Sequence, residues 1–313
     1  MKNFLHILLL LLLFTAGVWS AAVMSVVLHL PRWMDWVLFT AMIILFAEAF
    51  TSRKAALMLA ILELSSMVHF MLLTPQEQFA DKKFMRIFAV KPAVNYLPDG
   101  TFEVINYRDN RYRTMDDYED NFIRAKFDPA KVEALEMASV HWDNMAMAAH
   151  TMFNFKFSDG KELTVSVEPR TPEEWSRAPF HCLCKQQELL FVLGSPQDIF
   201  DLRVNYRGED LYLYQMKMSP AEIRIFLDYV IARADKLAGE PEFYHLLTHN
   251  CITALLPGLK KALPELDPDW RIILNGEFPR MLYSRDLLEC REGESFESLK
   301  SRSFRKGKSQ GKL

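Results

Sequence analysis

The first quarter of the chain is built from long apolar runs, and the remainder alternates apolar and polar positions as a water-soluble domain does. Three runs approach or exceed the roughly 20 apolar residues that a helix needs to cross a bilayer. They are residues 4–30, 33–50 and 55–74. Lys2 and the Arg53-Lys54 pair flank these runs and belong on the cytoplasmic side by the positive-inside rule. The pattern predicts a membrane region at residues 1–74, with the rest of the chain outside the cytoplasm.

Two features of this region admit other interpretations. The first run could be a cleaved signal peptide, because Leu8–Phe14 is a plausible apolar core and Ser20 a passable exit site. The third run contains Glu63 and His69, and ionisable groups at membrane depth are candidates for function. The alternative for Glu63 is a structural position that faces the neighbouring helices.

The pattern after Thr74 predicts strands first and helices later. Residues 75–100, with a Pro98-Asp99-Gly100 turn, are expected to form a linker into a domain at 101–295. Alternation at 151–157 and 163–167 around Ser158-Asp159-Gly160 predicts a hairpin. Further strands are expected at the following ranges: 101–107, 188–193, 198–204 and 210–217.

Helical spacing appears in the second half of this domain. Ser219-Pro220-Ala221-Glu222 has the signature of a capping box, and apolar residues then recur at helical spacing to Leu237. A last helix is expected to begin near Asn250-Cys251. The fold class predicted is α+β: three transmembrane helices, then a mainly antiparallel sheet with packed helices. Residues 296–313 are expected to form a basic flexible tail.

Composition and charge narrow the function classes. Half of the residues are apolar and a quarter are charged, which is typical of a folded protein. The net charge is −3, and the basic residues of the tail leave the rest acidic on balance, so a nucleic-acid partner is not expected. No glycine-rich phosphate loop occurs, and His245 and His249 lack an HExxH arrangement, so neither a cofactor nor a metal site is predicted.

One of the four cysteines is a candidate nucleophile. Cys251 follows Thr248-His249-Asn250 at the expected start of a helix, where the helix dipole favours a thiolate. The alternative is a buried structural cysteine. Cys182 and Cys184 are too close in sequence to bridge without strain, and a disulfide from one of them to Cys290 stays open.

The hairpin supplies a candidate base. If Gly160 takes the left-handed position of a three-residue loop, His150 lies directly opposite Glu168 across the two strands. A carboxylate beside an imidazole fixes its tautomer and raises its basicity, as a cysteine–histidine pair requires. In the alternative, His150 is an edge histidine and Glu168 pairs with Arg170.

Several of these residues stand in runs that resemble the Lnb-type N-terminal periplasmic domain family. The resemblance extends over about residues 96–263 in consistent order, and its clearest runs are Ala149–Phe155, Ser166–Arg170, Gln187–Leu189, Arg203–Tyr214 and Pro241–Thr253. His249 and Ile252 differ from the usual family pattern, which has asparagine and threonine there.

The resemblance implies a permuted papain-like cysteine fold, similar to lecithin:retinol acyltransferase-like domains. It implies that Cys251 is the nucleophile, His150 the general acid and base, and Glu168 the orienting group, with the Cys251 amide in an oxyanion hole. Residues expected to support the site or bind substrate are Asn250, Tyr244, Arg203 and Glu188.

The function expected from the resemblance is acyl transfer through a thioester on Cys251, from a membrane phospholipid to a lipoprotein amino terminus. The protein would then be a multi-pass component of a bacterial inner membrane with its soluble domain in the periplasm. Two alternatives stay open. The protein could be a cell-envelope amidase or peptidase, which a shallow polar groove would favour, or a non-catalytic envelope binding module.

Overall fold

A computed structural model describes all residues except 1, 29–30, 50, 143–144, 176–179 and 308–313. The chain forms two compact units. The first comprises residues 1–82 and 174–187, and the second comprises residues 83–173 and 188–313. The α+β class predicted from the sequence is confirmed.

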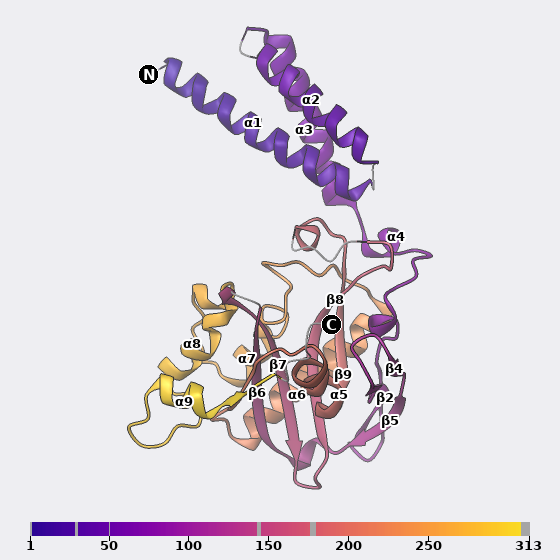
Figure 1. The fold of residues 1–313 in the computed structure, drawn as a ribbon, viewed down its shortest axis with the longest axis vertical. Coiled ribbons are helices and arrows are strands. Elements are labelled where there is room, and N and C mark those ends of the chain that lie inside the picture. The colour runs from indigo at the N-terminus through magenta and orange to yellow at the C-terminus, as the bar shows by residue number, and fades with distance from the viewer. Residues whose placement is uncertain (1, 29–30, 50, 143–144, 176–179, 308–313) are drawn as a thin grey trace. The chain divides into compact units, whose positions relative to one another are not determined.

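The first unit is helical (Figure 1). Its helices are α1 (Lys2–Val27), α2 (Arg32–Ala49), α3 (Arg53–Leu72) and the short α4 (Pro75–Gln78). Residues 54–72 of α3 are long and apolar enough to cross a membrane. Residues 13–27 and 36–49 form shorter apolar helical stretches within the part of the chain described. Within the described residues, one helix therefore has membrane-spanning length and composition, and three spans stay a prediction.

The three long helices pack closely at one glycine. A Cβ atom on Gly17 of α1 would lie 2.3 Å from Cε of Met42 and 3.0 Å from Oε1 of Glu63, so a larger residue there would require the Met42 side chain to move. Glu63 faces the other helices and lines two mainly apolar cavities, of about 360 and 510 Å³.

The inserted segment 174–187 packs against these helices within the first unit. Cys184 is fully buried in a cluster with Val23 and Val27, and Phe180 packs beside them. Lys185 Nζ donates to the carbonyl oxygens of Phe70 at 2.7 Å and Leu73 at 3.1 Å, at the end of α3. Cations favour this end of a helix, because its carbonyls lack partners within the helix.

The second unit is organised around one mixed sheet. Its strands are β1 (Ala93–Tyr96), β2 (Phe102–Arg108), β5 (Phe122–Phe127), β6 (Val132–Trp142), β7 (Met145–Phe157), β8 (Glu162–Arg170), β9 (Glu188–Gly194), β10 (Leu211–Gln215) and β11 (Phe304–Arg305). Their order is β1-β2-β9-β8-β7-β6-β10-β11, with β5 beside β2. Every pairing is antiparallel except that of β2 with β9. The short strands β3 (Arg111–Tyr112) and β4 (Tyr118–Glu119) pair separately.

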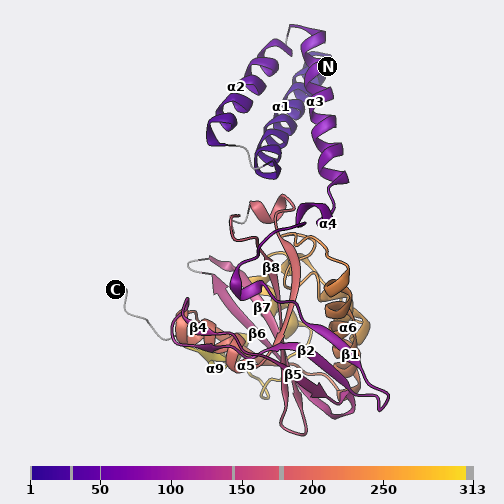
Figure 2. The same cartoon turned by 90° about the vertical axis from the view of Figure 1, so that its right-hand side faces the viewer.

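Helices cover both faces of the sheet (Figure 2). Helix α6 (Pro220–Gly239) begins with the predicted capping box and places Phe226 against Phe153 and Phe155, with ring centroids 5.2 and 5.5 Å apart. On the opposite face, Ile199 and Phe200 of α5 (Pro196–Asp201) belong to a buried cluster with strand residues such as Met152. The even-numbered residues of β7 and β8 therefore face α5.

Three sequence predictions need correction. Residues 198–204 are not a strand but α5 and a π-helical turn, Leu202–Tyr206, because Ser195 caps the amide of Asp198 and Pro196 starts the helix. The expected linker 75–100 contains β1, whose backbone pairs with β2. The tail is not flexible over 296–305, because α9 (Phe296–Arg302) buries Phe296 and Leu299 and β11 pairs with β10.

Candidate active site

The predicted hairpin brings His150 and Glu168 together. Met152 of β7 pairs with Ser166 of β8, which is the expected register, and Gly160 in the loop has φ +80°. His150 Nε2 lies 3.2 Å from Glu168 Oε1, and both side chains are largely buried. The alternative pairing of Glu168 with Arg170 does not form, since Arg170 binds Glu188 instead.

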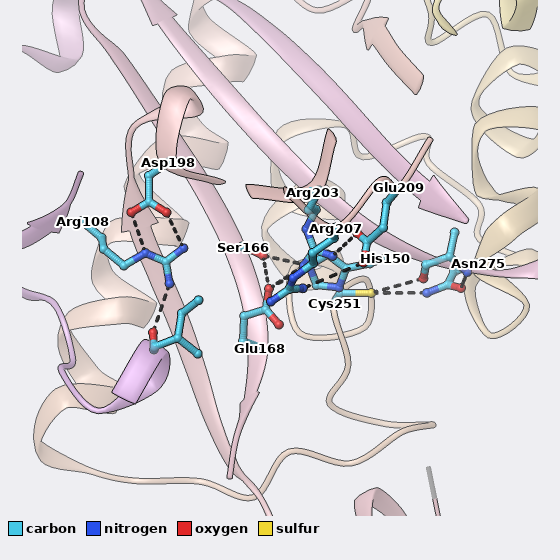
Figure 3. Close-up of polar contacts among 12 residues, drawn as sticks. Arg108, His150, Ser166, Glu168, Asp198, Arg203, Arg207, Glu209, Cys251 and Asn275 are labelled. Atoms are coloured by element: carbon cyan, nitrogen blue, oxygen red, sulfur yellow. Dashed lines mark hydrogen bonds and ion pairs between the residues drawn. The ribbon is translucent and has the colours of Figure 1, made fainter. Parts of the chain in front are cut away.

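Two further residues converge on Glu168 (Figure 3). The Ser166 hydroxyl donates to Oε1 at 2.7 Å, and Arg203 Nη2 donates to the same oxygen at 2.9 Å. Burial alone raises the pKa of the Glu168 carboxyl, but the facing His150, Arg203 and Ser166 outweigh it and hold that pKa well below its usual range. Glu168 is therefore an anion at neutral pH.

The anionic carboxylate fixes the direction of the hydrogen bonds around His150. Because the single hydroxyl hydrogen of Ser166 points to Glu168, Ser166 Oγ accepts from His150 Nε2, 2.8 Å away. His150 therefore carries its hydrogen on Nε2 in the neutral ring, which leaves Nδ1 as the nitrogen that can accept a proton. This is the tautomer that a general base facing the sulfur needs.

Opposing effects act on the pKa of His150. Burial lowers that pKa and the Glu168 charge raises it, while Arg203 lowers it and hydrogen bonds to Cys251 and Glu168 raise it. The net direction is upward, so the imidazolium formed when the thiol loses its proton is stabilised.

Cys251 lies in a turn rather than at the start of a helix. Helix α7 spans Leu256–Ala262, with Pro257 in its first turn. Proline lacks an N–H group and fits only the first turn of a helix, so the expected start at residue 250 is displaced. Asn250 instead closes a tight turn: its Oδ1 accepts from the amides of Ile252 and Thr253, each at 2.9 Å.

The sulfur of Cys251 faces the strand that carries His150. Cys251 is 2% exposed, and its Sγ lies 4.0 Å from the carbonyl oxygen of Ala149. The sulfur also accepts from Asn275 Nδ2 at 3.3 Å. The thiol thus lies beside the residue that precedes His150, and a thiol close to an imidazole–carboxylate pair can support nucleophilic catalysis.

The remaining predicted site residues fall into two groups. Arg203 contacts Glu168 directly and also pairs with Glu209 at 3.1 Å, and Asn250 shapes the turn of Cys251. Glu188 lies in a different cluster, where it pairs with Arg170 and Lys91. Tyr244 is a buried residue between two isolated bridges, Glu188–Phe243 and His245–His249.

Ser166 and Asn275 were not predicted as site residues. Ser166 could have been found, because the register places it one position along the same face from Glu168. Asn275 begins a 3-10 turn, Asn275–Glu277, 24 residues beyond Cys251, and no periodicity or motif in the sequence marks it.

The four cysteines, all of which lie in the described part of the chain, form no disulfide. The bridge left open between Cys290 and Cys182 or Cys184 is therefore not formed, and Cys290 is exposed. Among the residues whose positions are described, no group of three histidine, cysteine or acidic side chains is placed to hold a metal ion.

Comparison with known proteins identifies one family. The model of the family described as the Lnb N-terminal periplasmic domain matches residues 118–276, which include His150, Glu168, Cys251 and Asn275. Searches of curated proteins and of solved structures returned no match.

Proposed function

The chain belongs to the Lnb N-terminal periplasmic domain family, and from that premise we propose that it is a membrane-anchored cysteine acyltransferase of the bacterial envelope. Cys251 would accept an acyl chain from a phospholipid as a thioester and pass it to an amine, the amino terminus of a lipoprotein. The proposal includes the three membrane spans and a periplasmic position for the soluble domain.

The observation that carries this proposal is the aligned set of polar groups from Cys251 to Arg203. The sulfur faces His150, whose Nε2 contacts Ser166 and Glu168, and Arg203 neutralises the carboxylate from the far side. A buried carboxylate, imidazole and thiol in this order are costly to maintain without a function, because buried charges must all be paired.

The arrangement supports two successive acyl transfers, first to the thiol and then to the amine. His150 Nδ1 takes the thiol proton, and Sγ attacks the ester carbonyl carbon to form a C–S bond and an oxyanion. The oxyanion collapses, the C–O bond to the glycerol breaks, and the leaving alkoxide takes the proton from His150. An amine then attacks the thioester and loses a proton to His150. The C–S bond breaks, and the thiolate recovers that proton.

Exposed apolar side chains that neighbour the site residues in sequence favour a lipid over a peptide substrate. Five exposed apolar residues stand close in sequence to His150, Cys251 or Asn275, and we term them the apolar rim: Met147, Leu247, Trp270, Ile273 and Leu274. Their exposed fractions range from 39 to 56%, and Trp270 is the most exposed. A peptidase groove would instead be expected to present polar groups.

The experiment is an intact-mass measurement of the full chain in detergent after incubation with phospholipid. We expect an added acyl mass that hydroxylamine removes, present in the unmodified protein and in Cys290→Ala, and missing in Cys251→Ala and His150→Ala. Cys290 is the matched control because it is an exposed thiol outside this site.

Two outcomes would contradict the lipid substrate. A thiol probe that labels Cys251 in a His150-dependent manner, without an acyl adduct, would favour hydrolysis of another envelope substrate. The absence of both signals would favour a binding module.

A further inference from the structure

The side chain of Asn275 links the two elements that carry the nucleophile and the base. Its Oδ1 accepts from the Ala149 amide at 2.8 Å, next to His150 on β7. Its Nδ2 lies 3.3 Å from the Cys251 sulfur. Asn275 is 9% exposed, so both contacts are sheltered from water. A buried amide contact to a thiol is stronger than an exposed one, because water does not compete for it.

The Ala149 amide fixes which end of the Asn275 side chain faces the sulfur. A backbone N–H can only donate, so the atom of Asn275 that it meets must be the carbonyl oxygen. The NH₂ group is then the end that faces Cys251. The sulfur consequently faces a donor whose orientation is set by the strand that also carries His150.

Three backbone amides near the sulfur already have acceptors. The amides of Ile252 and Thr253 donate to Asn250 Oδ1, and the amide of Ala149 donates to Asn275 Oδ1. The Ala149 carbonyl also faces the sulfur, but an acceptor cannot stabilise an anion. The Asn275 amide is thus a preorganised donor beside the reacting atom.

We propose that Asn275 is a catalytic residue that donates from Nδ2 first to the Cys251 thiolate and then to the oxyanion formed on the acyl carbon. This inference rests on the proposed function. When Sγ bonds to the carbonyl carbon, the negative charge leaves sulfur for the oxygen two bonds away. The NH₂ group has two hydrogens, so it can follow that charge without releasing Ala149.

The discriminating variant is Asn275→Asp in the full chain. Aspartate keeps an oxygen to accept from Ala149 but replaces the donor with an acceptor. We expect the pH midpoint for alkylation of Cys251 by iodoacetamide to rise, and the acyl adduct to form about 100-fold more slowly. Site-resolved mass spectrometry measures both, with Cys290 as the internal control thiol. A purely structural Asn275 would leave the midpoint and the rate unchanged, which would overturn the proposal.

A second variant, Asn275→Ala, tests the proposal if Asn275→Asp does not fold. Asn275→Ala removes the donor without adding a charge, so the alkylation midpoint should also rise, by less than with aspartate. An unchanged midpoint in folded Asn275→Ala would overturn the proposal. Alkylation needs no acyl donor. A raised midpoint therefore supports the role of Asn275 toward the thiolate even if the unmodified protein forms no adduct and the proposed function fails.

Discussion

The side chains of Ser166 and His150 meet at 2.8 Å from neighbouring strands, and the Ser166 hydroxyl points onward to Glu168. His150 Nε2 therefore faces two acceptors at once, the serine oxygen and the carboxylate, which lies 3.2 Å away. Two acceptors, rather than one, therefore orient the imidazole. The two acceptors can be removed separately, so the contribution of each is measurable.

Removing the charge of Glu168 should have the larger effect. In Glu168→Gln the carboxylate no longer raises the pKa of His150, while burial and Arg203 still lower it. The side-chain amide can also donate to His150 and favour the wrong tautomer. We expect acyl-adduct formation to slow by about 10²- to 10⁴-fold. Single-turnover mass spectrometry would measure this, and a loss below tenfold would contradict the role assigned to Glu168.

Removing the Ser166 hydroxyl should have a smaller effect. Ser166→Ala leaves the direct contact of His150 with Glu168 in place, so we expect adduct formation to slow by about threefold to tenfold, the value of one hydrogen bond. Thr164→Ala is the matched control, because Thr164 is buried on the same strand and donates to Asn154 rather than to the site. Equal effects of the two variants would mean that Ser166 acts through general packing.

Arg203 should matter for folding as well as for the site. Arg203→Ala leaves Glu168 without the cation that faces it and also releases Glu209, so the free energy of unfolding should fall by about 3–5 kcal/mol. The control is Arg113→Ala, which breaks an exposed pair with Asp117 and should leave the free energy of unfolding nearly unchanged. Denaturant unfolding measures both, and similar losses in the two variants would contradict the assignment.

The pH dependence of stability follows from the raised pKa of His150. Protonated His150 stabilises the folded state. This contribution is fully present below pH 6.5, the ordinary pKa of histidine, and it is lost as the pH rises through the higher pKa of the folded state. From about pH 6 to about pH 9, the thermal midpoint of the unmodified protein should therefore fall relative to that of His150→Gln. In Glu168→Gln this decline should disappear. A difference that grows with pH would contradict the direction assigned to the shift.

The sequence predicted the elements whose signals are local. The hairpin register followed from alternation and Gly160, and α6 followed from its capping box. Residues 198–204 were misassigned because their apolar residues fit a strand, although Ser195-Pro196 is a helix start. The position of Asn275 depends on how distant segments pack, so no local pattern could place its amide beside Cys251.

The segment 174–187 has a consequence for how this protein can be divided. It leaves the second unit after β8 and returns at β9, yet its apolar side chains are buried against α1 and α3. The polypeptide therefore passes between the two units three times, after residues 82, 173 and 187. A fragment cut at residue 83 would retain this excursion while losing the surface that covers Cys184 and Phe180, and it should be prone to aggregate. The helices of the first unit are thus a folding partner of the segment that joins β8 to β9.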